Sequence, residues 1–127
     1  MRSDNANKPA ATLVRRAAIA VFTAGIIAVS VLSLVPRTAM PGIEVWDKLE
    51  HTLAYLALAV TGAIAFPGRR RLAWLGLGLL ILGCLLEVTQ TFVPGRDGTV
   101  DDAVANAIGI GLGLALAGVA GTRLRLG

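Results

Sequence analysis

The chain has little charge, few aromatic residues and a single cysteine. Of its 127 residues, 16% are charged and 5% are aromatic, whereas soluble domains average about a quarter charged residues. The single cysteine, Cys84, excludes an intramolecular disulfide, so thiol content does not indicate a cellular compartment. The low charge is not typical of a soluble domain. A chain of this size buries only part of its surface on folding, so much of its apolar surface would stay exposed to water.

Most residues of the sequence are apolar. The sequence is 55% hydrophobic and has a mean hydropathy of +0.72, which favours a membrane as the solvent and membrane lipids as partners. A pI near 10.2 is also seen in nucleic-acid-binding proteins. Here, however, the basic residues flank apolar segments, as the positive-inside rule describes, so no nucleic-acid partner is predicted.

Four segments approach the length of about 20 mostly apolar residues that a membrane span requires. The second carries several charged or polar residues in its first two turns, and the third contains one glutamate. The predicted fold is all-α, an integral membrane bundle of four transmembrane helices. The predicted spans cover residues 17–35, 46–66, 72–93 and 103–121.

These spans form one predicted membrane domain, residues 17–121, with polar tails at residues 1–16 and 122–127. The first apolar run is longer than the roughly 7–15 residues of a signal-peptide core, which favours a retained span over a cleaved signal. One domain is the expected count for this length.

Basic residues indicate the orientation. If both termini are cytoplasmic, nine of the twelve lie inside, as the positive-inside rule expects. The predicted location is therefore the bacterial inner membrane, with several passes and both termini inside. The inner set is Arg2, Lys8, Arg15, Arg16, Arg69, Arg70, Arg71, Arg123 and Arg125, and the outer set is Arg37, Lys48 and Arg96.

In this topology most acidic residues lie on the outer side, which orientation alone does not require. Helical spacing places polar residues and glycines on a shared stripe of the second, third and fourth spans. Small residues allow transmembrane helices to approach closely, so these stripes are expected to face one another. The glycines predicted to mediate packing are Gly62, Gly83, Gly109 and Gly113.

Glu87 is the acidic residue deepest in an apolar segment. It lies seven residues before Pro94, about 10 Å along a helix, and the hydrocarbon half-thickness is about 15 Å. An acidic residue at a span centre costs about 3 kcal/mol and usually faces the bundle interior or a wet cavity. Glu87 is therefore expected to face other helices and to be paired by Arg96 or Lys48.

Simpler interpretations exist for several of these residues. Asp101 or Asp102 can cap the fourth helix, since aspartate is favoured at helix N-termini. Pro94-Gly95 is common turn chemistry, and His51 can be a hydrogen-bonded histidine of the bundle interior. Neither capping nor burial excludes a role in a site.

The polar residues occur in three motifs that together resemble the VanZ-like family, named for a teicoplanin-resistance accessory protein. The resemblance runs from about Trp46 to Gly113 and implies a small integral membrane protein of the bacterial envelope, sometimes linked to antibiotic resistance. Thr99 stands where serine is common, and a hydroxyl is retained. The motifs are Asp47-Lys48-x-x-His51-x-x-x-Tyr55, Glu87-x-x-Gln90, and Pro94-Gly95-Arg96-x-x-Thr99-x-x-Asp102-x-x-x-Asn106-x-x-Gly109.

Two function classes fit these residues. The first is a non-catalytic protein that binds a lipid-linked or cell-wall-related ligand, or a partner, and alters glycopeptide susceptibility; an oligomer is compatible with it. The second is an intramembrane enzyme on a lipid-linked substrate, with His51, Glu87 and Asp102 as candidate catalytic residues. The predicted ligand-binding residues are Asp47, Lys48, His51, Tyr55, Glu87, Gln90, Arg96, Thr99, Asp102 and Asn106.

A proton-coupled carrier is disfavoured, because the polar residues cluster on one side and no polar path reaches the cytoplasm. No cofactor motif is present. His51, Glu87 and Asp102 are the residues a metal would use, but one histidine without a nearby cysteine gives weak support for zinc. No metal site is therefore predicted.

Overall fold

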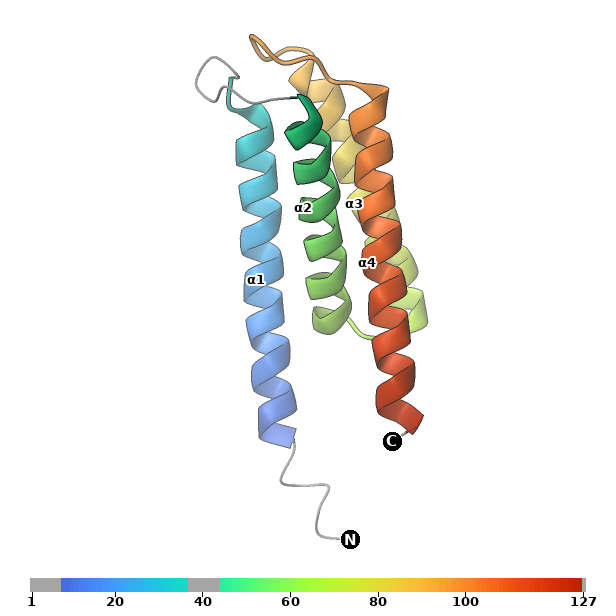
Figure 1. Ribbon diagram of the computed structural model, residues 1–127. Helices are drawn as coiled ribbons and strands as arrows, with labels where there is room; N and C mark the ends of the chain where they lie inside the picture. Colours follow the sequence, from blue (N-terminus) through green and yellow to red (C-terminus); the bar gives the residue numbers. More distant parts are fainter. Residues whose placement is uncertain (1–7, 37–43, 127) are drawn as a thin grey trace, which may run out of the picture.

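The computed structural model describes residues 8–36 and 44–126, and in these segments the chain is a bundle of four helices (Figure 1). Short connections join antiparallel neighbours, so the start of α1 and the end of α4 lie at the same end of the bundle. The helices are α1 (Lys8–Leu34), α2 (Glu44–Ala65), α3 (Arg69–Gln90) and α4 (Val100–Leu126).

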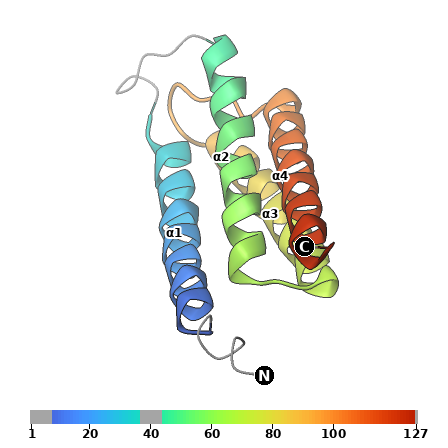
Figure 2. The ribbon, with the colours of Figure 1, turned by 60° about the horizontal axis from the view of Figure 1, so that its bottom comes forward.

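Helix α2 occupies the centre of the bundle. It contacts α1, α3 and α4, and α3 also contacts both α1 and α4, whereas α1 and α4 do not touch within the described segments. The two views in Figures 1 and 2 agree with this arrangement, in which α1 lies on one side of α2 and α4 on the other. The residues of α2 are therefore the ones best placed to meet side chains from every other helix.

Three of the four predicted spans are confirmed as helices long and apolar enough to cross a membrane: α1, α3 and residues 100–121 of α4. Helix α2 falls short of that description. Its first two turns carry Asp47, Lys48, Glu50 and His51, and these polar residues lower the mean hydropathy of the whole segment. The bundle is thus confirmed as all-α, with three membrane-like helices around a more polar central one.

The helices begin earlier than the predicted spans. Helix α1 starts at Lys8, inside the segment assigned to a tail, and its first nine residues continue the helix beyond the apolar run. Helix α3 ends at Gln90, and residues 91–93 form turns, because Pro94 disfavours helical backbone in the residue before it. Hydropathy marks the apolar part of a helix and does not mark the helix ends.

The buried core is small and contains mainly α2 side chains. Tyr55, Leu58 and Ala59 of α2 pack with Leu79 of α3 and Ile110 of α4. Phe22 of α1 makes an edge-to-face contact with Phe66, with ring centroids 5.8 Å apart. These contacts fix α2 against its three neighbours.

The outer surface of the bundle is apolar. Large hydrophobic side chains such as Ile27, Leu85, Val88, Ile108 and Leu116 are all more than half exposed. A soluble monomer rarely exposes a contiguous apolar surface of this extent, whereas in a bilayer such side chains face hydrocarbon tails. This exposure agrees with the membrane character of α1, α3 and α4.

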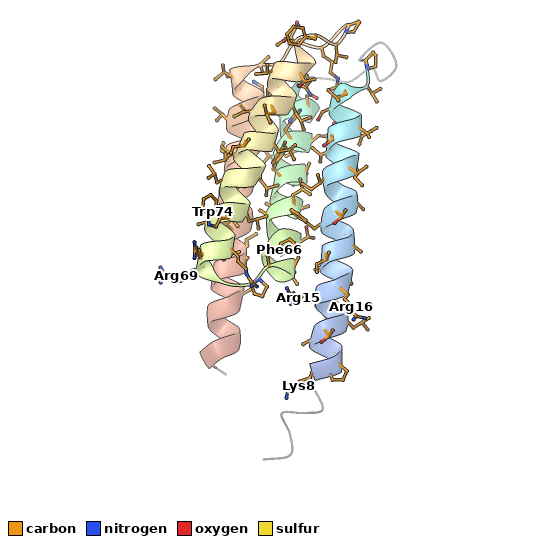
Figure 3. All side chains as sticks on the ribbon, turned by 180° about the vertical axis from the view of Figure 1, so that it is seen from behind. Lys8, Arg15, Arg16, Phe66, Arg69 and Trp74 are labelled. Carbon is orange, nitrogen blue, oxygen red and sulfur yellow. The ribbon has the colours of Figure 1, made fainter. Side chains whose placement is uncertain are left out.

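Cations gather at the end of the bundle where α1 begins. Figure 3 shows Lys8, Arg15, Arg16 and Arg69 at this end, with Trp74 one turn further along α3. The Arg15 Nε donates a hydrogen bond of 3.0 Å to the Ala65 carbonyl at the end of α2. This contact satisfies a carbonyl that has no partner within its own helix.

Two glycines of α4 let its backbone approach α2. A Cβ atom at Gly109 would meet the Thr52 carbonyl oxygen, and a Cβ atom at Gly113 would lie 2.7 Å from the Leu56 carbonyl oxygen. Gly62 and Gly83 are also packed, since a Cβ at Gly62 would lie 2.8 Å from the Leu75 side chain. Close approach of α2 and α4 therefore depends on positions 109 and 113.

We expect Gly109→Ala to destabilise the bundle by about 1–3 kcal/mol, because the added methyl group cannot be accommodated without moving α2. Gly111→Ala is the matched control, since a Cβ there meets nothing within 4 Å and alanine favours helix. Thermal unfolding in detergent measures both. Equal melting temperatures for the two variants would contradict the close α2–α4 contact.

Candidate functional site

Polar side chains gather where α2 and α4 begin and α3 ends. In Figure 1 this end of the bundle lies opposite the start of α1 and the end of α4. A pocket of about 290 Å³ opens here between the start of α2, the end of α3, residues 95–99 and the start of α4. It is lined by Asp47, Lys48, Gln90, Gly95, Arg96, Asp97, Thr99, Asp101 and Asp102. Six of these residues were predicted as ligand-binding and a seventh, Asp101, was considered only as a cap; Asp97 and Gly95 were not proposed as site residues.

A tight turn after α3 brings the next segment back over the bundle. The Arg96 amide donates to the Val93 carbonyl at 3.1 Å, and Gly95 has a φ of 75°. This geometry, with Pro94 second and glycine third, is that of a type II turn, in which the third position requires positive φ. The Pro94-Gly95 pair therefore determines where the Arg96 side chain can reach.

The Arg96 side chain binds the end of α1. Its Nε donates to the Val35 carbonyl at 2.7 Å and a terminal nitrogen donates to the Leu32 carbonyl at 2.8 Å. Gln90 adds a buried bond of 3.1 Å from Nε2 to the Ser33 carbonyl. The last carbonyls of a helix have no partners within it and carry partial negative charge. These two residues therefore close the C-terminus of α1 while still lining the pocket.

The start of α4 is capped by Thr99. Its Oγ1 accepts the Asp102 amide at 3.2 Å and donates to the Asp102 carboxylate at 2.8 Å. Threonine is a favoured N-cap, and an acidic residue in the first turn complements the helix dipole. The N-cap is thus Thr99 and not Asp101 or Asp102, which were the caps considered from the sequence. Asp102 lies in the first turn of α4, and its carboxylate also lines the pocket.

Glu87 is held by the same capping segment. Its Oε2 accepts the backbone amide of Thr99 at 3.3 Å. Residue 98 passes so close to α3 that a Cβ there would meet the Glu87 carbonyl oxygen, which explains why the position is glycine. Glu87 therefore accepts an amide at the N-terminus of α4 from a different helix.

The other oxygen of Glu87 meets α2 and α4. Glu87 Oε1 lies 3.7 Å from Nδ1 of His51 and 3.5 Å from Nδ2 of Asn106. His51 Nδ1 lies 3.0 Å from Oδ1 of Asn106. Glu87 is 7% exposed and Asn106 is 2% exposed, so a carboxylate, an imidazole and an amide from three helices form a buried polar cluster. We call these three residues the interior cluster.

The pairing predicted for Glu87 is wrong. Arg96 binds the end of α1, and Lys48 Nζ forms an ion pair of 3.0 Å with Asp101. The physical reason is the difference in burial. The side chains of Lys48 and Asp101 are 52% and 71% exposed, so this pair lies at the surface, whereas Glu87 is buried in the bundle. The partners of Glu87 are instead the Thr99 amide, His51 and Asn106.

Tyr55 lies directly inward of the interior cluster. It is 1% exposed, and its hydroxyl has no hydrogen-bond partner among the described residues. A Cβ at Gly83 would lie 3.1 Å from the Asn106 amide nitrogen and 3.3 Å from the Tyr55 hydroxyl, so the two polar atoms share the space beside that glycine. A buried hydroxyl without a partner costs about 1–3 kcal/mol.

The residues that could hold a metal ion differ from those considered from the sequence. Ligand atoms of Asp47, His51 and Asp102 all lie within 4.8 Å of one another. Glu87 is not in this group, because both of its oxygens face groups of the protein interior. Asp47 takes its place, since it lies one turn before His51 on the same face of α2.

Sequence reasoning missed three contributors. Ser33 supplies the carbonyl that Gln90 binds, Asp101 neutralises Lys48, and Gly98 permits the contact with α3. A serine within an apolar span and a glycine just before a helix cap were the available signals. Neither indicates its partner without the tertiary structure.

The fold and the site together define a small all-α membrane protein with a polar pocket at one end of its bundle. The chain belongs to the VanZ/LLP1 family, whose match extends over residues 5–121 and so covers nearly the whole sequence. Neither the search of curated proteins nor that of solved structures finds a match for this chain.

We expect Glu87→Leu to destabilise the protein by about 1–3 kcal/mol, because the Thr99 amide loses its acceptor inside the bundle. Glu87→Gln should be milder, since an amide oxygen can still accept that bond. Chemical or thermal unfolding in detergent measures both, with the exposed Glu50→Gln as control.

The contacts also predict independence from Arg96. In a double-mutant cycle, Glu87→Gln and Arg96→Gln should be additive within about 0.5 kcal/mol, since the two side chains share no partner. A stable Glu87→Leu protein, or strong coupling between positions 87 and 96, would contradict this description of the interior cluster.

Proposed function

We propose that this VanZ-family protein binds the anionic headgroup of a lipid-linked or cell-wall-related ligand in the polar pocket, and thereby alters glycopeptide (teicoplanin) susceptibility. The observation that carries the proposal is the pocket itself, of about 290 Å³, with two cationic residues on its wall. Lys48 has three donors, one of which bonds Asp101, and Arg96 has five, two of which bind the α1 carbonyls. Phosphate and carboxylate groups are the ligands that the remaining donors recognise.

The position of the pocket favours an amphiphilic ligand. It opens at one end of the bundle, next to helices whose outer faces are apolar, such as Leu85 and Val88 of α3. A lipid chain could lie along that surface while its headgroup enters the pocket. A small soluble ligand would not use the apolar surface.

The alternative is an intramembrane enzyme in which His51 and Glu87 exchange protons with substrate. Their separation of 3.7 Å places the two groups close together, although it is longer than a hydrogen bond. Neither residue lines the pocket, however, whereas Asp102 does. A general acid or base must come within hydrogen-bond distance of the reacting group. The contacts of Glu87 therefore favour a positioning role, and the binding function is the better supported of the two.

We further propose that the protein lies in the bacterial inner membrane with all four helices spanning and both termini in the cytoplasm. Support comes from the cations Lys8, Arg15, Arg16 and Arg69, which share one end of the bundle (Figure 3), as cytoplasmic ends usually do. Helix α2 would cross with one face packed against its three neighbours and with apolar side chains such as Leu53 and Ile64 exposed to lipid. The pocket would then face the outer side.

Cysteine labelling tests this topology in a Cys84→Ala background. We expect Asp97→Cys to react with an impermeant maleimide in intact cells and Pro67→Cys to react only after permeabilisation. Both positions are exposed, so failure to label is not a matter of burial. Labelling of Pro67→Cys from outside would overturn the orientation.

Native mass spectrometry of the full-length protein tests the ligand, with a polyprenyl phosphate as probe and the matching polyprenol as its neutral control. We expect selective retention of the phosphate and a loss of about tenfold in affinity for Lys48→Gln, equivalent to ~1.4 kcal/mol. Glu50→Gln, a nearby exposed charge on α2 outside the pocket lining, should bind as the unchanged protein does.

Equal retention of the phosphate and the neutral polyprenol would contradict headgroup recognition. The susceptibility part of the proposal has its own readout. Expression in a teicoplanin-sensitive bacterium should raise the inhibitory concentration, and Lys48→Gln should remove the increase. An unchanged inhibitory concentration would refute that part alone.

A further inference from the structure

Three potential metal ligands meet beside the pocket. Asp47 and Asp102 lie on its wall, His51 is next to them, and one ligand atom from each residue falls within 4.8 Å of the others. Two carboxylates so close together repel one another, and a divalent cation between them would neutralise both charges. The three residues come from two helices, so the spacing results from the α2–α4 packing and not from a local motif.

The contact with Asn106 indicates which nitrogen of the His51 imidazole is free to bind a metal. With Nδ2 of Asn106 directed at the Glu87 carboxylate, Oδ1 of Asn106 is left to face His51. Nδ1 of His51 must then carry the proton and donate it, which leaves the lone pair on Nε2. Metal-bound histidines usually donate their other ring nitrogen to a carbonyl or carboxylate in this way, which fixes the tautomer and the ring orientation.

A second observation comes from the inner end of the cluster. The Tyr55 hydroxyl is enclosed, has no partner within the described segments, and lies beside the same Asn106 amide that holds His51. Enclosed polar groups are nearly always bonded to protein, water or ligand. The unpaired hydroxyl therefore marks the inner side of the interior cluster as a place where one more polar group would be stabilised.

We propose that Asp47, His51 and Asp102 bind one divalent transition-metal ion, of the Mn²⁺ or Zn²⁺ type, on the inner wall of the pocket. Two carboxylates and one imidazole form a mixed oxygen–nitrogen set, which suits these ions better than it suits Ca²⁺ or Cu⁺. Three protein ligands leave coordination positions open, and here they would face the pocket. Thr99, bonded to Oδ2 of Asp102 at 2.8 Å, would hold that carboxylate in place.

An ion at this position would give an anionic headgroup a third cationic contact beside Lys48 and Arg96, both on the pocket wall. That clause rests on the proposed function, whereas metal binding itself does not. The two are therefore tested by separate measurements on the same protein.

The experiment titrates Mn²⁺ into the full-length, chelator-treated protein in detergent, without added lipid, and follows free Mn²⁺ by electron paramagnetic resonance. We expect saturation at one ion per chain, and competition by Zn²⁺. Asp47→Asn and Asp102→Asn should each weaken binding by at least about tenfold, the lower end of what changes around metal ligands cost.

The matched control is Asp97→Asn. Asp97 is an exposed carboxylate on the same pocket wall and is not part of the three-residue group, so its removal should leave Mn²⁺ affinity unchanged. Melting curves without metal identify any variant that fails to fold. If Asp102→Asn unfolds because the bond between its side chain and the Thr99 hydroxyl is weakened, Asp47→Asn still tests the metal site.

Two results would overturn the metal site: no saturable Mn²⁺ binding by the unchanged protein, or an equal loss in Asp97→Asn and Asp47→Asn. Mn²⁺ binding without retention of polyprenyl phosphate would refute the proposed headgroup function and leave the metal site intact. Phosphate retention that is unaffected by chelator and by Asp47→Asn, in a protein that binds no Mn²⁺, would do the reverse.

Discussion

The carboxylate of Glu87 links every part of the polar end of the bundle. One oxygen accepts the amide of Thr99, the N-cap of α4, and the other faces His51 of α2 and Asn106 of α4. A carboxyl group inside an apolar bundle is costly unless its oxygens are hydrogen-bonded. This requirement brings the end of α3, the start of α4 and the second turn of α2 to one point.

The pocket follows from that convergence. Once α3 and α4 are joined through Glu87, the chain between them must turn back within residues 91–99, and Pro94-Gly95 provides the turn. The turn directs Arg96 across the bundle to the last carbonyls of α1. Buried contacts therefore hold the residues behind the pocket, while Lys48 and Asp101 remain exposed at its mouth.

Membrane solvation accounts for the unequal composition of the helices. Helices α1, α3 and α4 contain apolar stretches long enough to cross a membrane, whereas α2 has polar residues in its first two turns and contacts all three neighbours. In a bilayer, polar side chains are tolerated where protein encloses them. The helix with polar first turns is consequently the central one, and Gly109 and Gly113 of α4 allow α4 to pack closely against it.

The sequence by itself determined the helical class, the membrane character and the family. Apolar runs of sufficient length, glycine stripes and three spaced motifs are local features, and they also placed Glu87 toward other helices. Partner choice was decided only by the tertiary structure. Arg96 was expected on Glu87 but binds α1, because the free carbonyls at the end of a helix distant in sequence lie within its reach. Likewise, Asp47 and His51 come close to Asp102 only because Gly109 and Gly113 allow α4 to pack directly against the α2 backbone. Such pairings depend on the relative positions of helices, which a single sequence does not encode locally.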